Sequence, residues 1–109
     1  MRCLLKISSG GVLFISLLLS ACSSAPGKPK TYTVEIKDMK FIPNDVVVEK
    51  GDTVMWINRD MVPHDVTDSA KSWSSGSLAA GGSWKTAITE DADYYCSIHV
   101  VMKGKVELK

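Results

Sequence analysis

The chain has 109 residues, a length that fits one small domain. It carries 13 basic and 12 acidic side chains, which gives a formal net charge of +1 at pH 7. Such a balance lacks the basic excess by which nucleic-acid-binding proteins attract phosphates, so we expect no nucleic-acid partner. The informative features of this chain are therefore local motifs.

The N-terminal residues have the features of a secretion signal. A basic start precedes the apolar stretch 12–19, which is too short to span a membrane as a helix. The following Leu19-Ser20-Ala21-Cys22 resembles the bacterial lipobox, in which cleavage precedes the cysteine and its sulfur is acylated. An ordinary cleaved signal is the alternative. We expect removal of residues 1–21 and lipid anchoring through Cys22, on the periplasmic or outer-surface side of a bacterial membrane.

Residues 22–30 are rich in Ser, Pro and Gly and have no periodic apolar positions, which predicts a flexible tether. The folded domain should then occupy residues 31–109. Its only cysteine is Cys96, because the other two fall in the signal and at the acylation site. An unpaired thiol in an exported domain needs an explanation. Metal ligation supplies one, because a coordinated thiolate is protected from oxidation.

The domain alternates short β-branched and aromatic runs with Gly, Asn, Asp and Pro, and no segment of ten residues has helical spacing. This predicts an all-β sandwich of about seven to eight strands. The expected strands are 32–37, 46–49, 53–58, 64–67, 83–88, 93–96 and 105–109. Alternation directs one set of apolar side chains inward, namely Val34, Ile36, Val46, Val48, Val54, Trp56, Val106 and Leu108. Phe41 should plug one end of this core, and Trp73 should pack back onto the sheet.

A segment of seven residues brings together the thiolate of Cys96, the imidazole of His99 and the thioether of Met102. His64 is the remaining histidine and the best candidate for a fourth ligand. Two His and one Cys with a weak axial Met form the ligand set of blue-copper centres. Taken singly, each residue has an ordinary interpretation as a solvated or buried side chain. Their combination predicts copper, whereas zinc is disfavoured because only one thiolate is available.

Several stretches then resemble the plastocyanin/azurin family of cupredoxins, namely 41–43, 50–58, 63–66 and 94–106. Within that family, the short Cys-x₂-His-x₂-Met loop and the position of Asn58 six residues before His64 are most similar to the amicyanins. The resemblance covers residues 31–109. It implies a Greek-key β-sandwich that binds one type 1 copper through His64, Cys96, His99 and Met102, and that carries single electrons between larger redox proteins.

One residue beside the ligands departs from the family pattern. Relatives commonly have Asn after the upstream histidine, and its backbone N–H donates to the cysteine sulfur; this chain has Asp65. A carboxylate near the copper should favour Cu(II) and lower the reduction potential unless it is solvated or paired. Asp65 and Asn58 are therefore the residues that we expect to support the ligands from outside.

The resemblance also implies a place where electrons enter. The edge of His99 should emerge through a small apolar patch formed by Met61, Val62, Pro63, Val100 and Val101. Packing around the loops is the alternative interpretation of these residues. Transient redox encounters use small apolar surfaces, which favours the patch.

The leading functional hypothesis is a monomeric single-electron carrier that meets a redox donor and an acceptor transiently. The alternative is copper handling, by buffering or delivery, although such sites usually have exposed Met-rich or His-rich clusters. A copper oxidase or nitrite reductase needs further histidines, and both histidines of this chain already belong to one site. We therefore expect no enzymatic activity.

Overall fold

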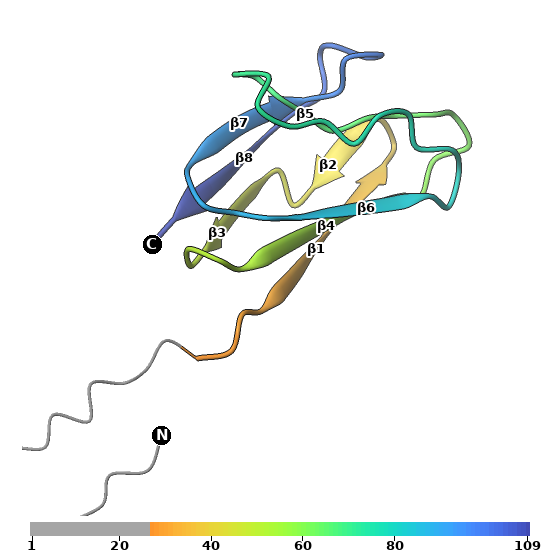
Figure 1. The fold of residues 1–109 in the computed structure, drawn as a ribbon. Helices are drawn as coiled ribbons and strands as arrows, with labels where there is room; N and C mark the ends of the chain where they lie inside the picture. The colour runs from red at the N-terminus through yellow and green to blue at the C-terminus, as the bar shows by residue number, and fades with distance from the viewer. Residues whose placement is uncertain (1–26) are drawn as a thin grey trace, which may run out of the picture.

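The computed structural model describes residues 27–109, so the predicted signal, Cys22 and most of the tether lie outside the described residues. The described chain forms eight strands in two four-stranded sheets that pack face to face (Figure 1). Within 27–109 there is no helix long and apolar enough to cross a membrane. The predicted all-β sandwich is confirmed.

The first sheet has the order β2-β1-β4-β6. Its strands are β1 (Thr31–Lys37), β2 (Lys40–Ile42), β4 (Thr53–Asn58) and β6 (Ser83–Ala87). β1 pairs with β2 and β4 with β6 in antiparallel fashion, whereas β1 and β4 are parallel. A parallel pair cannot be joined by a tight hairpin, so the chain crosses to the other sheet between these two strands.

The second sheet has the order β3-β8-β7-β5. Its strands are β3 (Asp45–Val48), β5 (Thr67–Asp68), β7 (Ala92–Tyr95) and β8 (Lys103–Leu108). β3 and β8 are parallel, and β7 pairs antiparallel with both β8 and β5. The last strand, β8, therefore lies between β3 and β7, and β7 and β8 are joined at one end of the sandwich by the predicted copper loop (Figure 1).

Two strand predictions need correction. Strand β2 was not expected, because three residues are too short for a recognisable alternation. The predicted strand 64–67 is wrong for most of its length, because the regular strand β5 begins only at Thr67. His64 instead forms an isolated bridge with Leu78, preceded by Pro63, which has no N–H to donate to a ladder.

The core is the one that alternation predicts. All the expected inward residues are buried except Leu108, which is half-buried and packs against the others. Phe41 is buried, and Trp73 packs partly against Trp56 with ring centroids 5.8 Å apart. Burial raises the pKa of Tyr94 to about 12, so its phenol stays neutral in this apolar surrounding.

The end of the sandwich where the chain enters β1 is fixed by Asp52. Its carboxylate accepts the N–H of Lys30 at 2.9 Å and that of Glu49 at 3.0 Å. Thr53 N–H in turn donates to Lys30 O at 2.8 Å. The two backbone donors, Lys30 first, lower the pKa of Asp52 below its ordinary value. Asp52 therefore ties the start of the domain to the turn before β4.

Acid should weaken this attachment. The pKa of Asp52 is lower in the folded chain than in the unfolded chain, where it is about 3.9. Its ionised carboxylate therefore contributes fully to the free energy of unfolding above that pH, and this contribution is lost as pH falls through the folded pKa. We expect Asp52→Asn to lower the Tm of the copper-free domain at neutral pH. The difference in Tm between wild type and variant should become smaller on acidification to about pH 3. Thermal unfolding monitored by circular dichroism at both pH values measures the loss of Tm and its pH dependence. A Tm difference that is constant with pH would contradict this role.

Candidate metal centre

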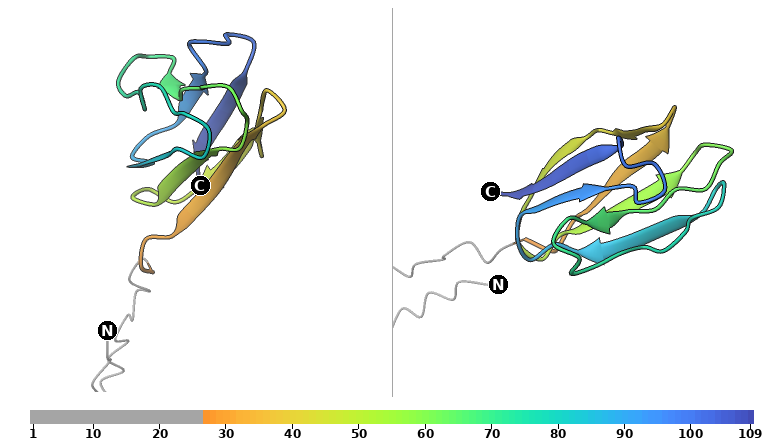
Figure 2. Two further views of the ribbon diagram at one scale, coloured as in Figure 1. Left: turned by 90° about the vertical axis from the view of Figure 1, so that its right-hand side faces the viewer. Right: turned by 90° about the horizontal axis from the view of Figure 1, so that it is seen from above.

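The two loops that carry the predicted ligands lie at the end of the sandwich opposite the point where the chain enters β1 (Figure 2). The loop 96–102 connects β7 to β8, and the segment 59–66 follows β4. Both segments are held by strands of the core, one from each sheet. The two sheets therefore fix the distance between His64 and the Cys96 loop.

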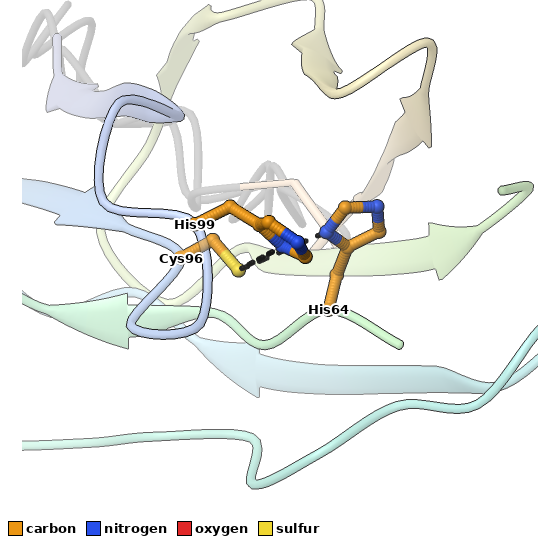
Figure 3. Close-up of side chains that lie close together, drawn as sticks. All are labelled: His64, Cys96 and His99. Carbon is orange, nitrogen blue, oxygen red and sulfur yellow. Dashed lines mark hydrogen bonds between the residues drawn. The ribbon is translucent and has the colours of Figure 1, made fainter. Parts of the chain in front are cut away.

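Three donor atoms meet between these loops. The Nδ1 atoms of His64 and His99 lie 3.8 and 3.9 Å from the Sγ of Cys96. All three donors lie within 4.8 Å of one another, and Figure 3 shows the sulfur and the two rings close together. Cys96 and His64 are fully buried, whereas His99 is half-buried. The site is thus closed toward the core and accessible only along the edge of His99.

Met102 closes the same loop. It is 3% exposed, and its N–H donates to His99 O at 3.0 Å while its carbonyl accepts from the Cys96 N–H at 3.1 Å. It lies immediately before β8 rather than within it. These two backbone bonds hold the thioether-bearing residue and the other loop residues in one compact turn.

The two distances from the Cys96 sulfur to the histidine nitrogens fit bonds to a single metal ion. Metal bonds of about 2.3 Å to sulfur and about 2.0 Å to nitrogen, as known for zinc, allow one ion to bridge donors up to about 4.3 Å apart. The observed sulfur to nitrogen distances, 3.8 and 3.9 Å, lie within this reach for a bent arrangement. A buried thiolate with two imidazoles and a neighbouring thioether is the donor chemistry that selects copper.

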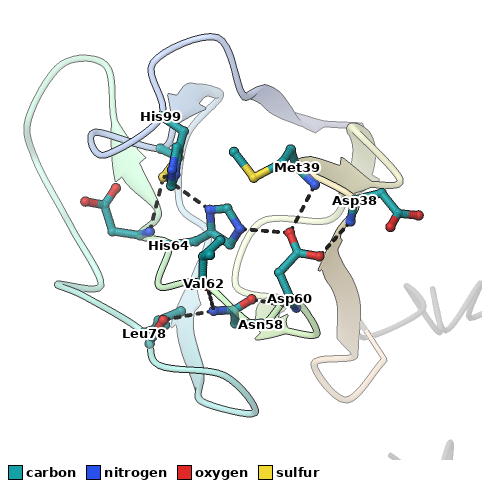
Figure 4. A network of polar contacts seen from close by, with 10 residues as sticks. Asp38, Met39, Asn58, Asp60, Val62, His64, Leu78 and His99 are labelled. Carbon is teal, nitrogen blue, oxygen red and sulfur yellow. Dashed lines mark hydrogen bonds and ion pairs between the residues drawn. The ribbon is translucent and has the colours of Figure 1, made fainter.

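His64 is oriented by a residue that the sequence analysis missed. Its Nε2 lies 2.8 Å from Oδ2 of Asp60, so the ring directs Nδ1 toward Cys96 (Figure 4). Asp60 also accepts the N–H of Asp38 at 2.7 Å and that of Met39 at 3.0 Å. An acid four residues before a candidate ligand histidine was the available signal.

The electrostatics of Asp60 follow from these contacts. Burial by itself raises the pKa of Asp60, but donation from Met39, His64 and Asp38 outweighs it, so the pKa lies below the ordinary value. Asp38 and Met39 both have positive φ, 53° and 61°, a backbone conformation that residues other than glycine rarely adopt. Asp60 therefore couples a tight β1–β2 turn to the orientation of His64.

Asn58 supports the same loop without touching the donor atoms. Its amide nitrogen donates to Val62 O and Leu78 O, both at 2.9 Å, and its Oδ1 accepts the Asp60 N–H at 2.9 Å (Figure 4). The side chain is fully buried. Asn58 thus holds the 58–62 turn, and through it Asp60, in position.

Asp65 lies between the two loops. Its backbone N–H donates to Cys96 Sγ at 3.4 Å, and its carboxylate accepts the Ser97 N–H at 2.7 Å. The hydroxyls of Ser97 and Thr67 donate to the same carboxylate. The carboxylate is therefore hydrogen-bonded by neutral donors and is neither solvated nor paired with a cation, since its side chain is buried and none of the described ion pairs includes it.

The comparisons with known proteins agree with this geometry. The profile of the copper-binding proteins of the plastocyanin/azurin family matches residues 29–109. The chain belongs to this family. As a cupredoxin it binds one copper ion, and its His, Cys, His group provides the donors that the family chemistry requires. The resemblance to the amicyanins is also confirmed.

Among the relatives of this cupredoxin is the amicyanin of Paracoccus versutus, 35% identical over 82 residues that cover 67% of this chain and 61% of that protein. The chain thus spans about three fifths of that relative's length. A Cu(I) structure of an amicyanin variant superposes with a TM-score of 0.68 at 30% identity, over 72% of this chain and 82% of that one.

An enzyme shares the fold of this cupredoxin. A copper-containing nitrite reductase from Thermus scotoductus SA-01 has a TM-score of 0.67 at 23% identity. The match covers 72% of this chain but only 22% of the enzyme chain. At that identity the similarity concerns the fold, so it transfers no activity to this cupredoxin.

The two loops that carry the donors expose several apolar side chains. Exposed fractions reach 91% for Met61, 84% for Val101 and 61% for Val100, and Val62 and Pro63 are also exposed. Ile98, which the sequence analysis did not include, is 47% exposed beside His99 in the chain. Both loops thus contribute large apolar side chains to solvent at the copper end of the cupredoxin.

Proposed function

We propose that this protein is a single-electron carrier with one type 1 copper held by His64, Cys96 and His99, and by Met102 as a weak axial ligand. The observation that carries the proposal is the convergence of three donors within 4.8 Å at the end of a rigid sandwich. Copper bound there would supply one-electron chemistry between Cu(II) and Cu(I), and the thioether of Met102 would favour the reduced ion.

The chain's own residues account for the carrier role. Asp60 and Asn58 fix the His64 ring, and the backbone bonds of Met102 fix the Cys96 loop, so the donors need not move when an electron arrives. Water is kept from the sulfur, because Cys96 and His64 are fully buried. The half-buried edge of His99 is the one ligand that a partner can approach.

Copper buffering or delivery is not supported by these features. Release of a metal requires access to its ligands, and two of the three donors have no exposed surface. An enzymatic centre is equally disfavoured, because a second copper site needs imidazoles and the chain contains only two histidines. Transient redox proteins are therefore the proposed partners.

The proposal is tested by adding one equivalent of Cu(II) to the purified domain. An intense blue absorption that bleaches on reduction and returns on oxidation, over many cycles, is the expected result. Stopped-flow mixing with a copper chelator then compares metal release with electron exchange, which should be much faster. A colourless complex, or release faster than electron exchange, would reject the carrier function.

We further propose that Met61, Val62, Pro63, Val100 and Val101, with Ile98, form the patch through which electrons enter. A negative charge within the patch should oppose close approach of two apolar patches, so Val101→Asp should slow electron self-exchange by at least about tenfold. Val47→Asp is a matched control, because Val47 is exposed at 47% on β3, away from the loops. Equal rates in the two variants would argue against the patch.

The lipid anchor remains a proposal for this chain. Lys30 precedes β1 and is hydrogen-bonded to Asp52 and Thr53 at the start of β4. The length of β4 places this start about 17 Å from Asn58 at the copper end. A tether leaving at Lys30 therefore leaves the apolar patch free for partners. Expression in a bacterium with labelled palmitate should label wild type but not Cys22→Ser, and only wild type should partition into detergent. A labelled Cys22→Ser variant would contradict the anchor.

A further inference from the structure

Asp65 carries a buried charge whose partners are all neutral. It is 6% exposed, and its carboxylate accepts hydrogen bonds from the N–H and hydroxyl of Ser97 and from the hydroxyl of Thr67. In the described part of the chain, the ion pairs involve other acids, Glu35 and Glu107, and Asp60 is hydrogen-bonded to His64. Hydrogen bonds stabilise the carboxylate, but they do not neutralise it.

This charge lies directly beside the metal donors. Asp65 follows His64 in the chain, its N–H donates to Cys96 Sγ at 3.4 Å, and its carboxylate binds the residue that follows Cys96. A buried charge is costly unless an opposite charge is near. Cu(II) with one thiolate and two neutral imidazoles carries a net charge of +1, whereas Cu(I) with the same ligands carries none. The opposite charge is thus available only in the oxidised centre.

We propose that Asp65 sets the reduction potential of this protein by selectively stabilising Cu(II), an inference that rests on the proposed copper site. The carboxylate joins the two ligand loops through its hydrogen bonds and is not itself a ligand. Its effect on the equilibrium between Cu(II) and Cu(I) comes from its charge. A lower potential restricts the electron donors to more strongly reducing proteins than an otherwise identical site with a neutral residue would accept. Asp65 is thus a specificity-determining residue for the redox partner.

The chosen variant removes the charge and keeps the shape. In Asp65→Asn an amide oxygen in the place of Oδ1 can still accept the Ser97 N–H and the Thr67 hydroxyl, and the Ser97 hydroxyl can turn to accept from the amide nitrogen in the place of Oδ2. Glu49→Gln is the matched control, because it makes the same change of charge at the opposite end of the sandwich, beside the Lys30 attachment. Asp65→Ser provides a second neutral residue at the site, should the amide be poorly accommodated.

Redox titration of the copper-loaded variants measures the effect. At a fixed applied potential, Asp65→Asn should raise the ratio of Cu(I) to Cu(II) at least tenfold, which corresponds to about 59 mV for one electron. Asp65→Ser should shift it in the same direction, and Glu49→Gln should change it less than twofold. Competition with chelators gives an independent readout, because by linkage the variant must weaken Cu(II) binding relative to Cu(I) binding by the same factor.

The outcomes separate the two proposals. A wild-type protein without a blue, reversible centre rejects the proposed function itself. A blue wild type together with blue Asp65→Asn and Asp65→Ser variants of unchanged potential overturns the role of Asp65 while leaving the carrier function intact. An equal shift in Glu49→Gln also overturns it, because the effect would then be one of overall charge. The Tm of the copper-free Asp65→Asn domain should stay close to wild type, and a large loss would show that the residue acts structurally.

Discussion

Replacing Cys96 with serine should abolish the blue absorption and weaken Cu(II) binding by more than about 100-fold. Removing a residue that merely supports a ligand typically costs 10 to 100-fold in metal affinity, and Cys96 supplies the thiolate itself. A serine hydroxyl stays protonated and offers copper no soft sulfur. Absorption spectra during a copper titration, followed by competition with a chelator, measure both effects.

The Cys96→Ser variant should still fold. Its hydroxyl occupies the place of the buried sulfur and can accept the Asp65 N–H, so Tm of the copper-free domain should change little. Met61→Leu is a control that removes a thioether exposed at 91% outside the site, and it should keep wild-type colour and affinity. A blue Cys96→Ser complex would refute the assignment of Cys96 as a ligand.

Replacing Gly104 with alanine should cause the largest loss of stability. Gly104 in β8 pairs with Tyr94 in β7, and the Tyr94 ring lies directly over it. An added Cβ would lie 2.3 Å from Cζ of Tyr94, a ring that is 1% exposed and has no space to retreat. We expect a loss of about 3 kcal/mol and a fall in Tm of roughly 10–20 °C.

Differential scanning calorimetry of the copper-free domain measures this loss. Gly27→Ala is the matched control, because a Cβ at Gly27 meets nothing within 4 Å, and its Tm should equal that of wild type. Gly104 also lies two residues after Met102, so displacement of β8 should disturb the copper loop and alter the blue spectrum. A Gly104→Ala domain with unchanged Tm would mean that Tyr94 does not occupy the observed position.

Short-range patterns predicted most of the framework. Alternation identified Val34, Val54 and Trp56 as core residues because successive side chains of a strand point to opposite faces. The seven-residue segment from Cys96 to Met102 indicated a shared loop for the same local reason. Patterns of this kind could not detect β2, which is only three residues long, or show that His64 forms an isolated bridge and not a strand.

Contacts between distant segments depended on the tertiary structure. The Tyr94 ring over Gly104, and the link of Asp60 to Asp38 and Met39, join residues whose separation in the chain gives no pattern. Each contact arises from the pairing register of strands or from the packing of a loop on a turn. Nothing in the residues flanking Gly104 or Asp60 specifies which distant partner they meet.

The sequence by itself determined the copper chemistry, because the types of donor and their spacing within one loop are written in the order of residues 96–102. It also raised the question of Asp65, whose carboxylate was expected to lower the potential unless solvated or paired. Only the tertiary structure decided the surroundings of that carboxylate, which is buried and bound by Ser97 and Thr67. The reason is physical: ligand identity is a property of side chains, whereas desolvation and hydrogen bonding depend on which segments the fold brings together.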